Sequence, residues 1–211
     1  MATGASNVGL FGFPLIEGLF GKPALGYAVM YDIGNTIMVF GIAYPIGSYF
    51  SENQQGKLSP KKILKKIVLL PPMMGMIVGL TINLLGVPLP NIATQTLETL
   101  AQANKALVLL LMGIYLSFEL NKSQLIAISK VLLMRYITGI IFAMTIYYFL
   151  PDSTMRSVLI VCVLLPLGMT ILPFSDEFNY DSRIAGTLLN ISLIISFVLI
   201  WAIVLRLHLA T

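Results

Sequence analysis

The sequence predicts an all-α protein that crosses a membrane about seven times, with two crossing helices broken by proline and glycine. Of its 211 residues, 57% are hydrophobic and 10% are charged, whereas soluble domains carry about 25% charged residues. The mean hydropathy is +0.90. Several apolar stretches reach the roughly 20 residues that a helix needs to cross about 30 Å of hydrocarbon. These observations exclude a soluble globular domain.

Seven apolar segments are expected in chain order, and each is a candidate membrane helix. Their approximate boundaries are residues 7–20, 24–49, 67–85, 97–118, 131–149, 158–174 and 184–205. A polar linker at 51–66, an uncharged turn at 86–91 and a polar loop at 119–130 separate some of them. Because Cys162 is the one cysteine, an intramolecular disulfide is excluded. The sequence offers no metal or cofactor site.

The distribution of lysine and arginine predicts the orientation. If the segments alternate, nine basic residues fall on one side of the membrane and three on the other. The nine are the five lysines of the 51–66 linker together with Lys122, Lys130, Arg135 and Arg183. Because loops rich in lysine and arginine stay in the cytoplasm, we expect a protein of the cell membrane whose N-terminus is cytoplasmic and whose C-terminus lies outside.

Two of the segments contain residues that interrupt helices. In residues 6–21, SNVGLFGFPLIEGLFG, Pro14 removes a backbone donor, and glycines lower helix propensity by about 1 kcal/mol each. In residues 164–178, LLPLGMTILPFSDEF, Pro166, Gly168 and Pro173 interrupt an apolar run. Backbone groups freed in lipid are tolerated only where protein or a watery cavity satisfies them. We therefore expect both segments inside the bundle, each split into two half-helices.

The pairing of these segments predicts a binding site. Each is followed by one long helix, and paired interrupted segments in corresponding places indicate the substrate site of a transporter. Where two such helices cross, four half-helix ends would converge near the membrane midplane. Their N-terminal ends carry unpaired N–H groups and a partial positive charge, which suits a carboxylate. The alternative is a pair of proline-kinked helices that only pack together.

The same two segments resemble a known family. The stretch NVGLFGFPLIEGLFG, which begins at Asn7, resembles the fourth helix of the auxin efflux carrier family, which reads as asparagine, apolar residues, Gly-x-Pro-Leu and a late glycine. Residues 165–189 are similar to the ninth helix and the start of the tenth. There a proline is followed about eleven residues later by an acidic–aromatic pair, here Glu177 and Phe178.

The resemblance implies a carrier of ten helices in two inverted five-helix repeats, in which helices four and nine cross. An elevator-like movement would carry small organic anions. The chain resembles helices four to ten, so residues 1–50 would end the first repeat, 51–66 would form a cytoplasmic linker, and 67–211 would form the second repeat. Transferred by position, the expected substrate-binding residues near the two breaks are Asn7, Gly12, Pro14, Pro166 and Gly168.

Other polar residues lie at membrane depth. Asp32, Asn35 and Thr36 share one helix face by their spacing. An intramembrane carboxylate is a candidate proton relay, and the alternative for this face is a structural hydrogen bond to the broken backbone. Lys105 is expected either to neutralise an anion or to line an interface between subdomains. Asn190, on the helix after the second break, loosely mirrors Asn35.

We predict a secondary transporter of small organic anions such as carboxylates, coupled to protons, and no enzyme activity. The alternatives are a sodium-coupled carrier of the bile-acid type, a seven-helix receptor and a non-functional fragment of a carrier. The expected partners are the anion, a proton or sodium ion, and membrane lipids. A second copy of the chain, or a protein that supplies further helices, is a further expected partner, whereas nucleic acid is not.

Overall fold

The computed structural model describes residues 4–51, 65, 68–69, 71–114 and 121–207. In these ranges the chain is helical and contains one isolated β-bridge but no strand, which confirms the all-α prediction for the described part. In order, the helices are η2 (Val8–Gly12), α1 (Phe13–Phe20), η3 (Lys22–Ala24), α2 (Leu25–Met38), η4 (Val39–Ala43), α3 (Tyr44–Tyr49), α5 (Pro71–Leu84), α6 (Asn91–Ile114), α7 (Lys122–Phe149), α8 (Thr154–Val163), α9 (Ile171–Glu177) and α10 (Ser182–Leu207).

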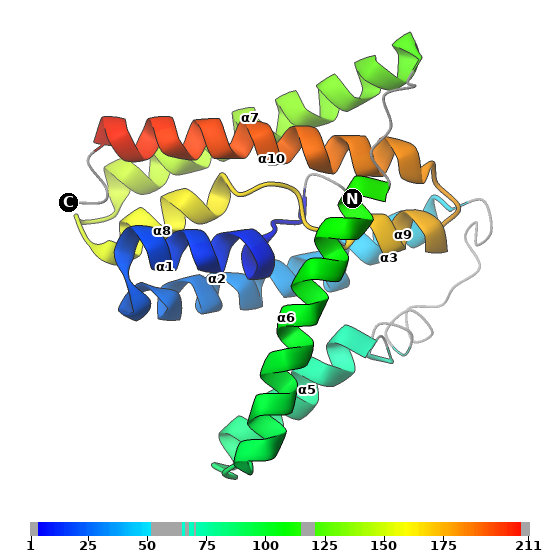
Figure 1. Cartoon of the computed structure of the whole chain (residues 1–211). Helices are drawn as coiled ribbons and strands as arrows, with labels where there is room; N and C mark the ends of the chain where they lie inside the picture. Colours follow the sequence, from blue (N-terminus) through cyan, green and yellow to red (C-terminus); the bar gives the residue numbers. More distant parts are fainter. Residues whose placement is uncertain (1–3, 52–64, 66–67, 70, 115–120, 208–211) are drawn as a thin grey trace.

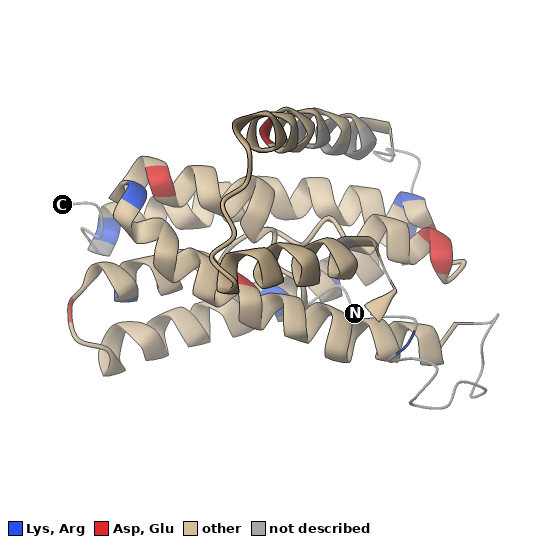
Figure 2. Ribbon diagram, turned by 90° about the horizontal axis from the view of Figure 1, so that it is seen from below, with Lys and Arg blue, Asp and Glu red and all other residues tan. Residues whose placement is uncertain are grey.

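Within the described ranges, three helical stretches are long and apolar enough to cross a membrane: Lys22–Tyr49, Lys122–Phe149 and Ser182–Arg206. Val8–Phe20, Met73–Leu84 and Thr154–Val163 are shorter apolar helices. Figure 2 shows that the charged residues gather mainly at the two ends of the bundle. The exposed side chains on these helices are largely apolar, as expected for a surface that contacts lipid tails.

The helices form a layered bundle with one projecting hairpin (Figure 1). Helices α7 and α10 run side by side, and α8 contacts α7, α2 and α1. Helix α9 packs against α10. Helices α5 and α6 are joined by a turn at Gly86 and extend away from the bundle, and α6 contacts α10.

The buried side chains surround the segment between α8 and α9. One cluster joins α1, α2, α8 and the end of α10, and includes the fully buried Ala24 and Ala28, whose small side chains allow helices to approach closely. A second cluster joins α7, α10 and residues 167–172. A third contains Phe40, Tyr44, Phe174 and Phe178 and joins α9 to η4 and α3. The chain between α8 and α9 is therefore enclosed by protein.

The first interruption does not lie at Pro14, as the sequence analysis expected. Residues 5–7 are not helical, and a continuous helix then runs from Val8 to Phe20. Its first turn is a π-helix, in which Gly12 N donates to Asn7 O and Phe13 N donates to Val8 O. This wide turn already replaces the regular hydrogen-bond ladder where Pro14 lacks a donor. Pro14 thus lies inside a helix. The described residues contain three of the four expected half-helix ends: the start of the Val8–Phe20 helix, the end of α8 and the start of α9.

Helix α7 begins at Lys122, within the stretch that was expected to be a polar loop. The Asn121 side chain accepts a hydrogen bond from Gln124 N, and the Gln124 side chain accepts one from Asn121 N, both at 2.9 Å. This capping box satisfies two of the free N–H groups at the helix start. Residues 122–130 therefore form the first turns of a long helix.

Candidate functional site

The two interrupted segments meet and pair as a two-residue antiparallel bridge. Ser6 lies opposite Leu167. On either side of this pair, Asn7 N donates to Pro166 O at 2.9 Å and Gly168 N donates to Ala5 O at 3.0 Å. Backbone groups that leave a helix need partners when they are buried, and here each interruption supplies partners to the other. The expected crossing of the two segments is thus present, formed by extended backbone.

A side chain from the following helix holds each interruption in place. On α2, Asn35 Oδ1 accepts from Ser6 N at 2.9 Å and Asn35 Nδ2 donates to Ser6 O at 3.1 Å. On α10, Ser192 Oγ accepts from Leu167 N at 3.1 Å. The two halves of the crossing are therefore held in the same way. In each, a polar side chain on α2 or α10 accepts a hydrogen bond from the N–H group of the bridge residue.

Arg135 of α7 is a buried cation at this crossing. Its Nη2 donates to Ser6 Oγ at 3.1 Å, to Leu165 O at 2.7 Å and to Pro166 O at 3.4 Å. The last two carbonyls follow the C-terminal end of α8, where a positive charge is favourable. Arg135 is 6% exposed. It connects α7 to both interruptions.

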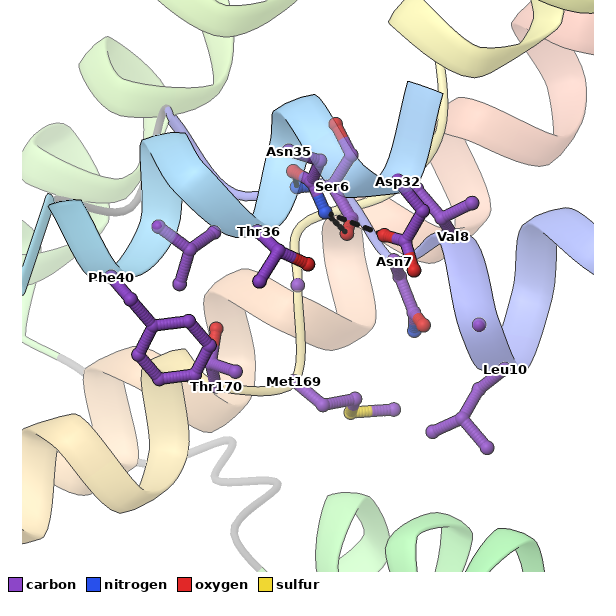
Figure 3. Close-up of a pocket in the computed structure, with 13 residues that line it drawn as sticks. Ser6, Asn7, Val8, Leu10, Asp32, Asn35, Thr36, Phe40, Met169 and Thr170 are labelled. Carbon is purple, nitrogen blue, oxygen red and sulfur yellow. Dashed lines mark hydrogen bonds between the residues drawn. The ribbon is translucent and has the colours of Figure 1, made fainter. Parts of the chain in front are cut away.

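A pocket of about 190 Å³ lies beside the crossing (Figure 3). Its lining comes from the first interruption and helix η2, from the α2–η4 helix, and from the residues before α9. The lining residues are Ser6, Asn7, Val8, Gly9, Leu10, Asp32, Asn35, Thr36, Val39, Phe40, Gly168, Met169 and Thr170. Polar side chains are thus concentrated at the crossing, whereas Leu10, Val39, Phe40 and Met169 contribute apolar surface.

Two polar side chains in this pocket have few protein partners. Asp32 Oδ1 accepts a hydrogen bond from Asn35 Nδ2 at 3.1 Å, and Asp32 forms no ion pair with any described residue. Asn7 is 7% exposed, and its side-chain amide makes no hydrogen bond within the described ranges. Figure 3 shows that this amide points into the pocket. Buried polar groups normally have partners, so both side chains are candidates to contact a ligand.

A family model described as "Membrane transport protein" matches residues 1–204. The chain belongs to this family. The match confirms the resemblance to the auxin efflux carriers that Asn7–Gly21 and Leu165–Leu189 indicated. It also identifies the chain as a membrane protein concerned with transport, as the fold and the crossing had suggested.

The curated relatives carry the name transporter but no assigned substrate. The chain is 27% identical over 208 residues to an uncharacterized transporter of Methanothermobacter thermautotrophicus, an alignment that covers 97% of this chain and 67% of the relative. It is 28% identical over 114 residues to an uncharacterized transporter of Methanocaldococcus jannaschii, over 53% of this chain and 35% of the relative. No solved structure matches. The chain thus spans two thirds or less of the length of these relatives.

Of the predicted substrate-binding residues, some line the pocket and others pack between helices. Asn7 and Gly168 line the pocket, whereas Gly12, Pro14 and Pro166 do not. A Cβ atom at Gly12 would lie 2.7 Å from Leu165 Cδ1, so this glycine permits close packing of α1 against the second interruption. Pro166 is buried and contributes its carbonyl to the bridge. Pro14 is exposed on α1.

Of the predicted coupling residues, some line the pocket and others do not. Asp32 and Asn35 both line the pocket, and Asn35 makes the structural hydrogen bonds to the broken backbone that were the alternative to a relay. Asn190 lies away from the pocket, and its Nδ2 donates to Gly186 O within α10. The residue that mirrors Asn35 is therefore Ser192, two positions later. The side chain of Lys105 lies outside the described residues.

Arg135, Thr170, Ser192 and Met169 are site residues that the sequence analysis missed. Arg135 was counted with the basic residues of the cytoplasmic side, just inside the helix expected at 131–149, although an ionisable residue within an apolar segment was a signal for a buried role. Thr170 and Met169 lie within the second interrupted segment, and only the crossing shows that they face a pocket. The described residues contain no group of three metal-binding side chains.

The acidic–aromatic pair of the ninth helix has a structural role in this family member. Tyr44 of α3 donates its hydroxyl hydrogen to Glu177 Oε1 at 2.7 Å. Phe178 packs against Tyr44, with ring centroids 5.1 Å apart. Together these contacts fasten the end of α9 to α3, so the motif fixes the helix that follows the second interruption.

Proposed function

We propose that the protein is a secondary transporter of small organic anions such as carboxylates, and that the crossing forms its substrate site. The observation that carries this proposal is the bridge between Ser6 and Leu167, which joins two interrupted helices beside a polar pocket. Interrupted membrane helices of this kind hold substrates and coupling ions in transporters. Alternating access would then expose the crossing to each side of the membrane in turn.

Two features of the pocket support an anionic substrate. The helix Val8–Phe20 begins at the pocket, and the first N–H groups of a helix lack intrahelical partners and carry partial positive charge. The side-chain amide of Asn7 is a second available donor. A carboxylate can accept hydrogen bonds from both without a lysine or arginine.

Asp32 is the candidate coupling residue of this transporter. A half-buried intramembrane carboxylate without an ion-pair partner among the described residues is suited to bind and release a proton. The matched roles of Asn35 and Ser192 support two inverted repeats, to which residues 1–50 and 67–211 would contribute on either side of a cytoplasmic linker at 51–66. A second copy, or a protein that supplies further helices, would complete the assembly.

The proposed location is the cell membrane, with the N-terminus in the cytoplasm. Arg135 contacts the backbone at the crossing. It is therefore no longer counted among the basic residues that indicate the cytoplasmic side. The nine basic residues on the cytoplasmic side become eight, against three on the other side. The positive-inside bias therefore still supports the proposed orientation.

Sodium coupling is the second candidate. Oxygen-bearing side chains from three parts of the fold line the pocket, namely Asn7, Asp32, Thr36 and Thr170. Side-chain and carbonyl oxygens at broken helices coordinate sodium in other transporters. Imposed gradients distinguish the two ions, because a pH gradient without sodium drives uptake above that of empty liposomes, in which neutral acid enters passively, only in a proton-coupled carrier.

The test uses the purified protein in liposomes that are given radiolabelled acetate, malonate or benzoate. We expect uptake of at least one anion to increase when the outside is made acidic. We expect Asn7→Ala to reduce uptake at least tenfold, whereas Glu17→Gln, on an exposed part of α1, retains it. Uptake of all three anions no greater than in empty liposomes would contradict the proposed function. Uptake driven by sodium alone would favour the second candidate.

A further inference from the structure

We infer that the ionised carboxylate of Asp32 and a bound substrate carboxylate exclude each other from the crossing pocket, so that a monocarboxylate binds together with one proton on Asp32. This inference rests on the proposed function and specifies its substrate class and stoichiometry. It follows from the arrangement of donors and charges around one small pocket.

The donors for a carboxylate lie on the first interruption. Asn7 is more than nine-tenths buried, its amide points into the pocket, and it has no hydrogen-bond partner in the described ranges. Gly9 and Leu10 also line the pocket, in the first turn of the helix Val8–Phe20. In this turn Val8 N donates to Ser6 O and Gly12 N donates to Asn7 O, so the N–H groups of Gly9 and Leu10 are the backbone donors that the turn offers to an anion. An amide and a helix start thus converge on the same space.

Asp32 lines this same space and is an internal competitor for these donors. Asn35 contacts one of its carboxylate oxygens, which fixes the carboxyl group at the edge of the pocket. Two carboxylates that share a small site cannot both remain ionised, because each raises the energy of the other's charge. A substrate carboxylate can therefore enter only when Asp32 carries a proton.

No other charged group in the described pocket lining can balance the second negative charge. The titratable neighbours of Asp32 are Tyr31 on α2 and Cys162 on α8. Arg135 on α7 lines a different cavity, which shares Ser6 and Asn35 with this pocket, and its Nη2 binds the interrupted backbone. Glu17 and Lys22 are exposed near the far end of the Val8–Phe20 helix. The proton on Asp32 is thus the available counter-charge.

Size and charge define the substrate class. A cavity of about 190 Å³ holds roughly six water molecules at about 30 Å³ each, which is enough for a carboxylate with a few further heavy atoms. The described lining contains no lysine or arginine for a second carboxylate. The pocket therefore favours small monocarboxylates over dicarboxylates.

The experiment measures proton uptake on binding. Acetate, propionate and malonate are titrated calorimetrically into the purified protein in buffers of different ionisation enthalpy, between pH 5 and pH 8. We expect the wild type to bind acetate or propionate with uptake of one proton at high pH. The apparent Kd should rise about tenfold per pH unit there, as linkage to one proton requires. Malonate should bind at least tenfold more weakly.

Asp32→Asn removes the carboxylate that competes with the substrate. If this variant does not fold, Asp32→Ala serves as a second neutral variant. We expect the folded variant to bind without proton uptake, with a Kd that is flat with pH and at least tenfold lower than that of the wild type at pH 8. Glu17→Gln should keep the wild-type pH slope. Asn7→Ala should weaken binding at least tenfold at the acidic end of this range, where ionised Asp32 competes least.

The outcomes separate the two proposals. Absence of binding of any of the three anions to the wild type would contradict the proposed function, and the inference with it. Binding without proton uptake in the wild type, or an unchanged pH slope in both Asp32 variants, would overturn the inference alone. Wild-type affinity in Asn7→Ala would show that the donors are assigned wrongly.

Discussion

Asn35 pairs with the backbone of Ser6 through both groups of its side-chain amide, as a neighbouring strand would. Its Oδ1 accepts from Ser6 N at 2.9 Å, and its Nδ2 donates to Ser6 O at 3.1 Å. The same Nδ2 also donates to Asp32. One amide thus satisfies an unwound residue and holds the candidate coupling carboxylate, which links the geometry of the crossing to the charge in the pocket.

Replacing Asn35 should therefore destabilise the fold as well as the site. Asn35→Ala leaves the N–H group of Ser6 without this partner, whereas Ser6 O keeps the hydrogen bond from Val8 N at 3.1 Å. Because one unsatisfied buried group costs about 1–3 kcal/mol, we expect a loss of about that size. Thermal unfolding can be followed by labelling Cys162, the one cysteine, which is buried in the native state. Asn83→Ala, on an exposed part of α5, is the control and should leave the transition unchanged.

Arg135 should be more important for stability than an ordinary basic residue. Arg135→Ala removes a donor that serves one hydroxyl and two carbonyls, and hydrogen bonds from charged groups contribute about 1.5–3 kcal/mol each. We expect a loss of about 3 kcal/mol or more in Arg135→Ala and a smaller loss in Arg135→Lys. Arg206→Ala, exposed near the end of α10, should unfold as the wild type does. Equal stability of the two alanine variants would disprove this role.

Gly12 and Gly18 lie in one helix, but alanine should lower the free energy of unfolding at Gly12 and raise it at Gly18. A Cβ atom at Gly12 would lie 2.7 Å from Leu165 Cδ1, whereas one at Gly18 would meet no atom within 4 Å. Because Leu165 is fully buried, we expect Gly12→Ala to cost about 1–3 kcal/mol by overpacking. Gly18→Ala should gain up to about 1 kcal/mol from helix propensity. The same labelling assay measures both, and a stabilised Gly12→Ala would refute the close contact.

The parts that sequence reasoning predicted correctly depend on local chemistry. Prolines and glycines in Ser6–Gly21 and Leu164–Phe178 identified the two segments that meet, because interrupted helices need protein partners in a membrane. The spacing of Asp32 and Asn35 placed them on one face, and both line the pocket. These predictions required only helix geometry and the polarity of single residues.

The parts that it missed depend on contacts between distant segments. The break lies at residues 5–7 because a π-helical turn accommodates Pro14, and the position of the break follows from the pairing with Pro166 and Gly168. Ser192, not Asn190, mirrors Asn35, because the register of α10 against Leu167 is set by packing. Arg135 was counted only as a basic residue near the cytoplasmic side, since a count along the chain cannot show what its guanidinium contacts.

The crossing itself can be tested most directly by a disulfide. In the bridge, Ser6 and Leu167 face each other between the two flanking hydrogen bonds, an arrangement with Cα atoms about 4.5 Å apart, within the range that a disulfide spans. The test places Ser6→Cys and Leu167→Cys in a Cys162→Ala background, with a protease site inserted in the 51–66 linker.

After mild oxidation in membranes and cleavage, we expect the two fragments to stay joined until a reductant is added. The mismatched pair Ser6→Cys and Asn83→Cys should separate without reductant. Fragments of the first pair that separate as readily as those of the mismatched pair would contradict the crossing on which the proposed transport site depends.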